Sequence, residues 1–79
     1  MPKEFLNETE LTALAKKFRK EAGIKRAQAA RDMGVSQTSI FHAEESPEQG
    51  LSKLRVRMIE TYSPFKVKGP VFYLEPEKP

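Results

Sequence analysis

The sequence predicts a small, mostly α-helical domain with a short β-strand near its C-terminal end. Three observations favour this fold class. Apolar residues recur at steps of three and four along residues 7–22, which is the spacing of one helix face. Gly23 and Gly34 interrupt helical patterns where a residue with positive φ would end a helix. Residues 71–74 are aromatic or apolar and lie between two prolines, which is typical of an edge strand.

Composition limits the classes of function. The 79 residues carry a net charge of +3, are 38% hydrophobic and 32% charged, and contain no cysteine and one histidine. This balance predicts a single globular domain with no metal site, no cofactor and no disulfide, and it suits a polyanionic partner. The N-terminus lacks the apolar core of a signal peptide and no apolar run could span a membrane, so we expect a cytoplasmic protein. Glu44 and Glu45 point roughly 100° apart on a helix and the glycines are scattered, so we expect no catalytic site.

The first helix is expected over residues 7–22. Asn7 is a favourable N-cap, and Glu10 stands three residues later, as in a capping box. Acidic residues lie near its start and basic residues near its end, which matches the helix dipole. Its apolar stripe comprises Leu11, Leu14, Ala15, Phe18 and Ala22.

Residues 26–45 predict two short helices, 26–33 and 37–45, joined by a glycine turn. Ala30 stands where the two helices would cross closely, and Gly34 supplies the positive φ of the turn. Ser36 can cap the second helix. The residues expected to face inward are Ala29, Met33, Val35, Ile40 and Ala43. This arrangement is a helix-turn-helix, which places its second helix in the major groove of DNA.

At these residues the chain resembles the Cro/repressor-type, lambda repressor-like (XRE) helix-turn-helix family. The match is closest over GVSQTSI, residues 34–40, and extends back through residues 8–24. The resemblance implies a lambda repressor-like domain of about four helices and a sequence-specific transcriptional regulator of double-stranded DNA. Because one such module buries too little surface to bind DNA tightly, we expect a homodimer that reads half-sites about 34 Å apart. The residues that keep the motif's shape are Ala30, Gly34, Val35 and Ile40.

The resemblance implies that the helix at 37–45 reads bases through Gln37, Thr38, Phe41 and His42. The glutamine amide can pair with both hydrogen-bonding groups of an adenine edge. Phe41 could contact a thymine methyl group, or fold into the core or a dimer contact. The phosphate-contacting candidates are Lys25, Arg26, Ser36, Ser39, Lys53, Arg55 and Arg57. Glu44 and Glu45 are expected to repel phosphates, so that the end of this helix lifts out of the groove.

The chain beyond residue 45 leaves two architectures open. Residues 51–62 fit an apolar helical stripe, which we favour, but Leu54, Val56 and Met58 also alternate as in a strand. As a strand they would pair with residues 71–75 in a Cro-like α+β hairpin. We predict a helix-turn-helix domain over residues 1–62 and a C-terminal extension over 63–79, with a loop at 63–70 and a strand at about 71–75. That strand needs a partner: residues 65–68, residues 3–6, or a second copy of the chain.

Ala29 and Ala43 are small for core positions, so the core needs other side chains to fill it. Phe5, Phe18 or the C-terminal aromatic residues could do so; otherwise the domain would depend on a partner for stability. The aromatic residues that could instead form a dimer contact are Phe65, Phe72 and Tyr73. An alternative function follows from the C-terminal strand, which could extend the sheet of a partner protein, as in an antitoxin or adaptor.

Overall fold

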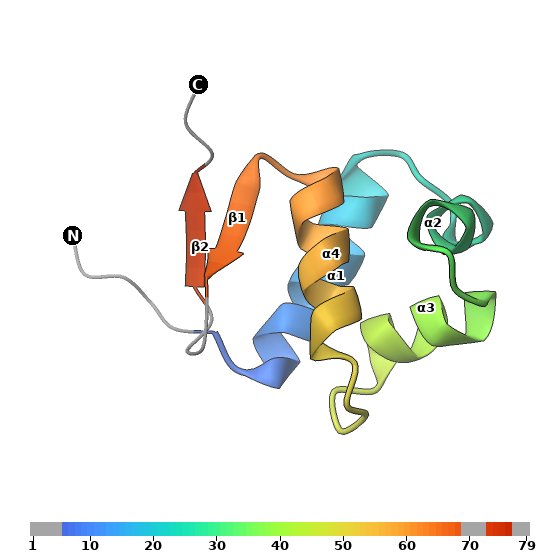
Figure 1. The fold of residues 1–79 in the computed structure, drawn as a ribbon, viewed down its shortest axis with the longest axis horizontal. Coiled ribbons are helices and arrows are strands. Elements are labelled where there is room, and N and C mark those ends of the chain that lie inside the picture. Colours follow the sequence, from blue (N-terminus) through green and yellow to red (C-terminus); the bar gives the residue numbers. More distant parts are fainter. Residues whose placement is uncertain (1–5, 69–72, 77–79) are drawn as a thin grey trace.

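The computed structural model describes residues 6–68 and 73–76. Four helices are followed by a two-stranded antiparallel sheet: α1 (Glu8–Glu21), α2 (Arg26–Met33), α3 (Gln37–Glu45), α4 (Ser52–Tyr62), β1 (Phe65–Lys68) and β2 (Tyr73–Pro76). The predicted mostly α-helical class with a C-terminal strand is therefore confirmed. In Figure 1, α1 and α4 pack together at the centre, with the sheet on one side and α2 and α3 on the other.

The local signals at both ends of α1 act as the sequence predicts. The Asn7 side chain accepts a hydrogen bond from the Glu10 amide at 2.8 Å, and the Glu10 carboxylate accepts one from the Asn7 amide at 2.9 Å. These two bonds are a complete capping box. After α1, Gly23 has a φ of +73°, and the Ile24 amide turns back to the Arg19 carbonyl at 3.1 Å. The chain therefore reverses there and leads into α2, which packs against α3 and α4.

Residues 52–62 form a helix, which confirms the favoured interpretation and makes the strand alternative wrong. Leu54, Met58 and Ile59 from α4 are buried, so the helical stripe is the pattern that the core uses. A hairpin exists nevertheless, but it lies after α4 and pairs β1 with β2, Phe65 opposite Pro76 and Lys68 opposite Tyr73. The predicted loop over 63–70 is wrong at residues 65–68, which are the ladder partner that the β2 backbone requires. Residues 71 and 72 of the predicted strand lie outside the described residues.

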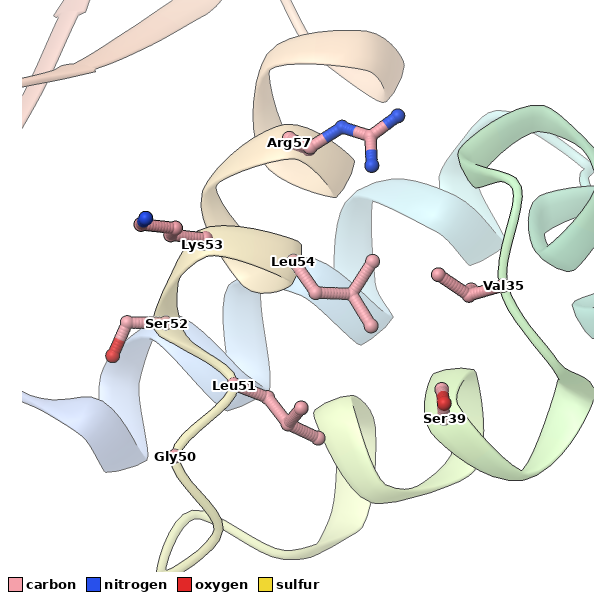
Figure 2. A pocket seen from close by; sticks show the side chains of 8 residues that line it. All are labelled: Val35, Ser39, Gly50, Leu51, Ser52, Lys53, Leu54 and Arg57. Carbon is pink, nitrogen blue, oxygen red and sulfur yellow. The ribbon is translucent and has the colours of Figure 1, made fainter.

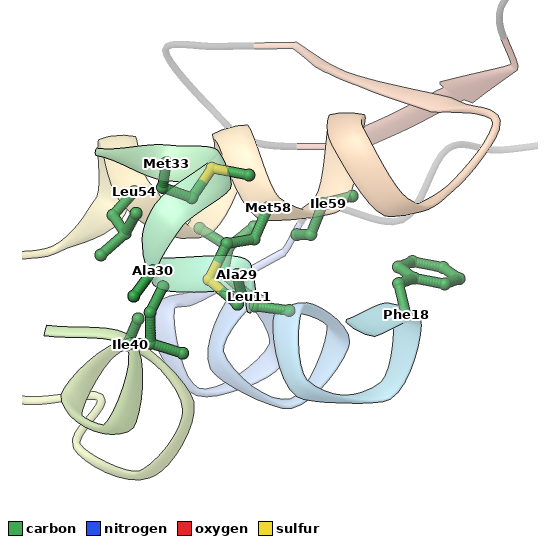
Figure 3. Close-up of a cluster of buried hydrophobic side chains, with 11 residues drawn as sticks. Leu11, Phe18, Ala29, Ala30, Met33, Ile40, Leu54, Met58 and Ile59 are labelled. Carbon is green, nitrogen blue, oxygen red and sulfur yellow. The ribbon is translucent and has the colours of Figure 1, made fainter. Parts of the chain in front are cut away.

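The core fills the space left by its alanines with methionine and phenylalanine. Figure 3 shows Met33 and Met58 near Ala29 and Ala30 at the crossing of the helices. Phe18 is buried, and its ring centroid lies 5.8 Å from that of Phe65 in β1. The unbranched, flexible methionine side chain fits irregular spaces of this kind. Phe18 is thus one of the expected aromatic residues that complete the hydrophobic core. Phe5 and Phe72 lie outside the described residues.

Candidate nucleic-acid interface

The turn between α2 and α3 sets the direction of α3. Gly34 is left-handed, with φ +70° and ψ +36°, and the Val35 amide donates to the Ala30 carbonyl at 3.0 Å. A side chain with a Cβ adopts this backbone conformation only at a cost, so glycine suits the turn. Ser36 then caps α3 by accepting a hydrogen bond from the Ser39 amide at 3.1 Å. Ala30 and Ile40 are buried and Val35 is half-buried, as the motif predicts.

The outer face of α3 carries three of the four predicted base-contacting residues. Gln37, Thr38 and Phe41 are exposed, and Phe41 is a large apolar residue with 44% of its surface exposed. Phe41 therefore does not fold into the core. His42 lies at the edge of this face and is half-buried, with Nδ1 3.2 Å from Ser46 Oγ at the end of the helix. The sequence did not predict this local contact of the imidazole.

Both carboxylates of α3 form ion pairs, Glu44 in the interior and Glu45 at the surface. The Glu44 side chain is fully buried and accepts hydrogen bonds from both Arg19 and Arg26, at 3.0 Å for Arg19 Nη2 and for Arg26 Nε. Glu45 accepts from Lys16 Nζ at 2.6 Å and from Arg26 Nη2 at 3.0 Å. The hydrogen bond from Lys16 is the main reason that the pKa of Glu45 is lowered. Each carboxylate therefore contacts two cations, and the two carboxylates share Arg26.

Arg19 is a buried structural cation that the sequence analysis did not identify. It is 8% exposed and also donates to the Ile24 carbonyl at 2.6 Å, so it ties the end of α1 to α3. A signal for it was present in the sequence, because Arg19 follows Ala15 by four residues and Leu11 by eight, and so falls on the buried stripe. A charged residue on an apolar stripe indicates a buried ion pair.

Arg55 is not available to phosphates, and its assignment as a phosphate contact is wrong. Its side chain is fully buried. Its guanidinium donates to the carbonyls of Ala43 at 3.0 Å, Ser46 at 2.7 Å and Gln49 at 3.0 Å, and to Glu8 Oε1 at 2.7 Å. This arginine holds the segment between α3 and α4 in place.

The other predicted phosphate-contacting cations differ in their exposure and in their hydrogen-bond and ion-pair partners. Lys25 and Lys53 are exposed, and neither side chain has a hydrogen bond or ion pair among the described residues. Arg57 is exposed as well, and its Nη1 donates to the Met33 carbonyl at 3.1 Å, beside the end of α2. Arg26 is one-third exposed and engaged by both carboxylates of α3. Of the two hydroxyl candidates, Ser36 is exposed and Ser39 is half-buried.

An open groove of about 560 Å³ lies between α3 and α4 (Figure 2). Val35 and Leu54 point toward each other across it, and Lys53 and Arg57 extend from α4. Its lining contains no acidic side chain among the described residues. The full lining is Val35, Ser39, Gly50, Leu51, Ser52, Lys53, Leu54 and Arg57. The groove thus places two cations beside α3 without an opposing carboxylate in its lining.

A further polar pair ties the end of α2 to the end of α4. Tyr62 donates from its hydroxyl to Asp32 Oδ2 at 2.6 Å, and Gln28 Nε2 donates to Oδ1 at 2.7 Å. These two hydrogen bonds lower the pKa of Asp32, and burial together with the bond to Asp32 raises the pKa of Tyr62. Within residues 6–68 and 73–76 no cluster of three or more histidine or acidic side chains is arranged to hold a metal ion.

Comparisons of the chain with protein-family models, with curated proteins and with solved structures found no match. Over the part of the chain that the structure describes, no helix has both the length and the apolar character needed to cross a bilayer.

Proposed function

We propose that this chain is a sequence-specific DNA-binding protein, a cytoplasmic transcriptional regulator that binds as a homodimer with α3 in the major groove. One observation carries the proposal above the others. The outer face of α3 presents Gln37, Thr38 and Phe41, whereas both carboxylates of the same helix are paired with cations. A helix approaching DNA must offer groups that match base edges and must not place free carboxylates against phosphates.

The surroundings of α3 support the same function. Lys25 lies just before α2, and Lys53 and Arg57 lie on α4 beside the groove, so exposed cations flank α3 on two sides. Cations in such positions attract the phosphate backbone without reading the sequence. The resemblance of residues 34–40 to Cro/repressor-type proteins agrees with this arrangement. The homodimer is proposed because a single small module buries too little surface to bind DNA tightly.

The test is selection of bound duplexes from a random pool at two salt concentrations, followed by sequencing. We expect the wild type to enrich a two-fold-symmetric site with half-sites about 34 Å apart. Gln37→Ala should lose the preference at one base pair of each half-site, at a cost of about 1–3 kcal/mol for the correct base.

Gln49→Ala is the matched control, because Gln49 is also an exposed glutamine but lies after α3. It should retain the enriched sequence unchanged. The proposal would be contradicted if the protein retained DNA without enriching any sequence and lost that DNA at the higher salt. Such a result would indicate only a generic basic surface.

The alternative function, in which the C-terminal strand extends a partner's sheet, stays a prediction. β2 has its ladder partner in β1, so on that edge its backbone needs no second protein. Removal of residues 70–79 separates the two functions, because DNA selection through α3 should survive it and capture of a partner by the strand should not.

A further inference from the structure

Arg26, the first residue of α2, contacts three side chains of α3. Its Nε lies 3.0 Å from Glu44 Oε1 and its Nη2 lies 3.0 Å from Glu45 Oε2. Its Cζ lies 5.2 Å from the centroid of the Phe41 ring, within the range of a cation–π interaction. The guanidinium therefore pairs with both carboxylates and also makes a cation–π contact with the Phe41 ring.

These contacts make Arg26 a poor phosphate ligand compared with its neighbour Lys25. A phosphate that approached Arg26 would also approach the carboxylate of Glu45, which is 33% exposed. Lys25 is exposed and has no carboxylate partner among the described residues. The two adjacent cations, both expected from the sequence to touch phosphates, thus have different surroundings.

The same contacts fix the Phe41 ring. An exposed aromatic side chain at a helix surface is free to occupy several rotamers. Here the guanidinium lies over the ring, and the His42 ring meets it edge-on, with centroids 5.5 Å apart and planes at 73°. The ring therefore stands at the outer face of α3 with 44% of the residue exposed. An apolar surface held in this way fits the C5-methyl group of thymine in the major groove.

We propose that Arg26 is a positioning residue that holds Phe41 outward to read a thymine methyl group, and that it makes no phosphate contact. This inference rests on the proposed DNA-binding function and names the contact that part of the recognition helix makes. Arg26 acts through Phe41, so its removal affects which base pair is preferred rather than the overall attraction to DNA.

The test compares Lys25→Gln with Arg26→Gln, two substitutions that remove one positive charge at adjacent positions. On the selected site, Lys25→Gln should weaken binding to all sequences alike and reduce the slope of log K against log salt by about 0.9 for each phosphate that is no longer neutralised. Arg26→Gln should leave that slope unchanged and abolish the preference for thymine at the Phe41 position.

Deoxyuridine supplies a second measurement, which needs no protein variant. Replacing each thymine of the selected site by deoxyuridine in turn removes one methyl group, and at one position the wild type should bind about fivefold more weakly. Phe41→Ala and Arg26→Gln should each abolish this difference, and the double variant should show no further change, as expected of residues that act as a unit.

A dispersed NMR spectrum checks that Arg26→Gln is folded. If it is not, Glu45→Gln is used instead; it removes one ion pair of Arg26 and should reduce the deoxyuridine effect.

Each other outcome overturns the inference in a recognisable way. A salt slope lowered by Arg26→Gln as much as by Lys25→Gln, with thymine preference intact, would make Arg26 a phosphate contact and leave the proposed function standing. Indifference of the wild type to every deoxyuridine would exclude a methyl contact by Phe41. Absence of any enriched site would remove the proposed function itself, and this inference with it.

Discussion

Arg55 and Arg57 stand two residues apart on α4 and have opposite environments. Arg55 is fully buried, and its guanidinium holds the carbonyls of the segment between α3 and α4 together with the carboxylate of Glu8. Arg57 is exposed at the edge of the groove beside α3, with one hydrogen bond to the Met33 carbonyl. A positive charge beside α3 is therefore either a buried structural contact, as in Arg55, or an exposed group, as in Arg57, and burial distinguishes the two.

The same division recurs on α3. Glu44 is buried between Arg19 and Arg26, whereas its neighbour Glu45 lies at the surface with Lys16 and Arg26. A buried charge that loses a partner remains in a medium of low polarity, so its removal is costly. An exposed charge is solvated in either state, so its ion pair contributes little. The pairs Arg55/Arg57 and Glu44/Glu45 thus allow buried and exposed charges of the same residue type to be compared.

The largest effect is expected from Arg55→Met. The substitution removes the buried guanidinium that donates to the carbonyls of Ala43, Ser46 and Gln49 and pairs with Glu8. It should lower the free energy of unfolding by about 3–5 kcal/mol, which is most of the stability of a domain of this size. Arg57→Met is the control and should cost below about 1 kcal/mol. Urea unfolding followed by circular dichroism measures both; equal losses of stability would mean that burial of Arg55 does not determine its role.

A smaller effect is expected from Glu44→Gln. The glutamine keeps the shape and one acceptor oxygen but leaves Arg19 and Arg26 without their shared negative charge, so the free energy of unfolding should fall by about 2 kcal/mol. Glu45→Gln should shift the unfolding midpoint far less, and a moderate salt concentration should erase its shift but not that of Glu44→Gln. A salt-sensitive destabilisation by Glu44→Gln would show that this carboxylate is solvated.

The smallest effect is expected from Tyr62→Phe, which removes the hydrogen bond from the hydroxyl to Asp32. That bond lowers the pKa of Asp32 in the folded chain, so the pair adds stability above the ordinary pKa of an aspartate, and this stability is lost as pH falls through the folded value. In Tyr62→Phe the pKa of Asp32 should rise toward the ordinary value, and the acid-induced loss of stability should be reduced. NMR titration of the Asp32 carboxyl carbon reports it directly; an unchanged pKa would contradict the assigned cause.

Local signals in the sequence were sufficient for α1, α2 and α3 and for the turn of the motif. The predicted bounds of α2 and α3 agree with the structure, because Gly34 and Ser36 each act on the few residues beside them. The capping box at Asn7 is equally local. On α4 the sequence left helix and strand open, and the helix formed because Leu54, Met58 and Ile59 all face the core. In the candidate interface, Gln37 and Thr38 are exposed, as the family resemblance implied. For Phe41 the sequence left an outward position, the core and a dimer contact open, and the structure excludes the core.

Only the tertiary structure decided the roles of the charges and the partner of the last strand. Arg19, Arg26 and Glu44 come together from three helices, and sequence separation says nothing of that distance. Arg55 needs carbonyls that lie 6 to 12 residues before it, as well as a carboxylate 47 residues away. β1 became a strand because β2 and α4 lie beside it, although its own four residues predicted a loop. By itself the sequence determined what depends on neighbours along the chain, whereas burial, ion pairing and strand pairing depend on neighbours in space.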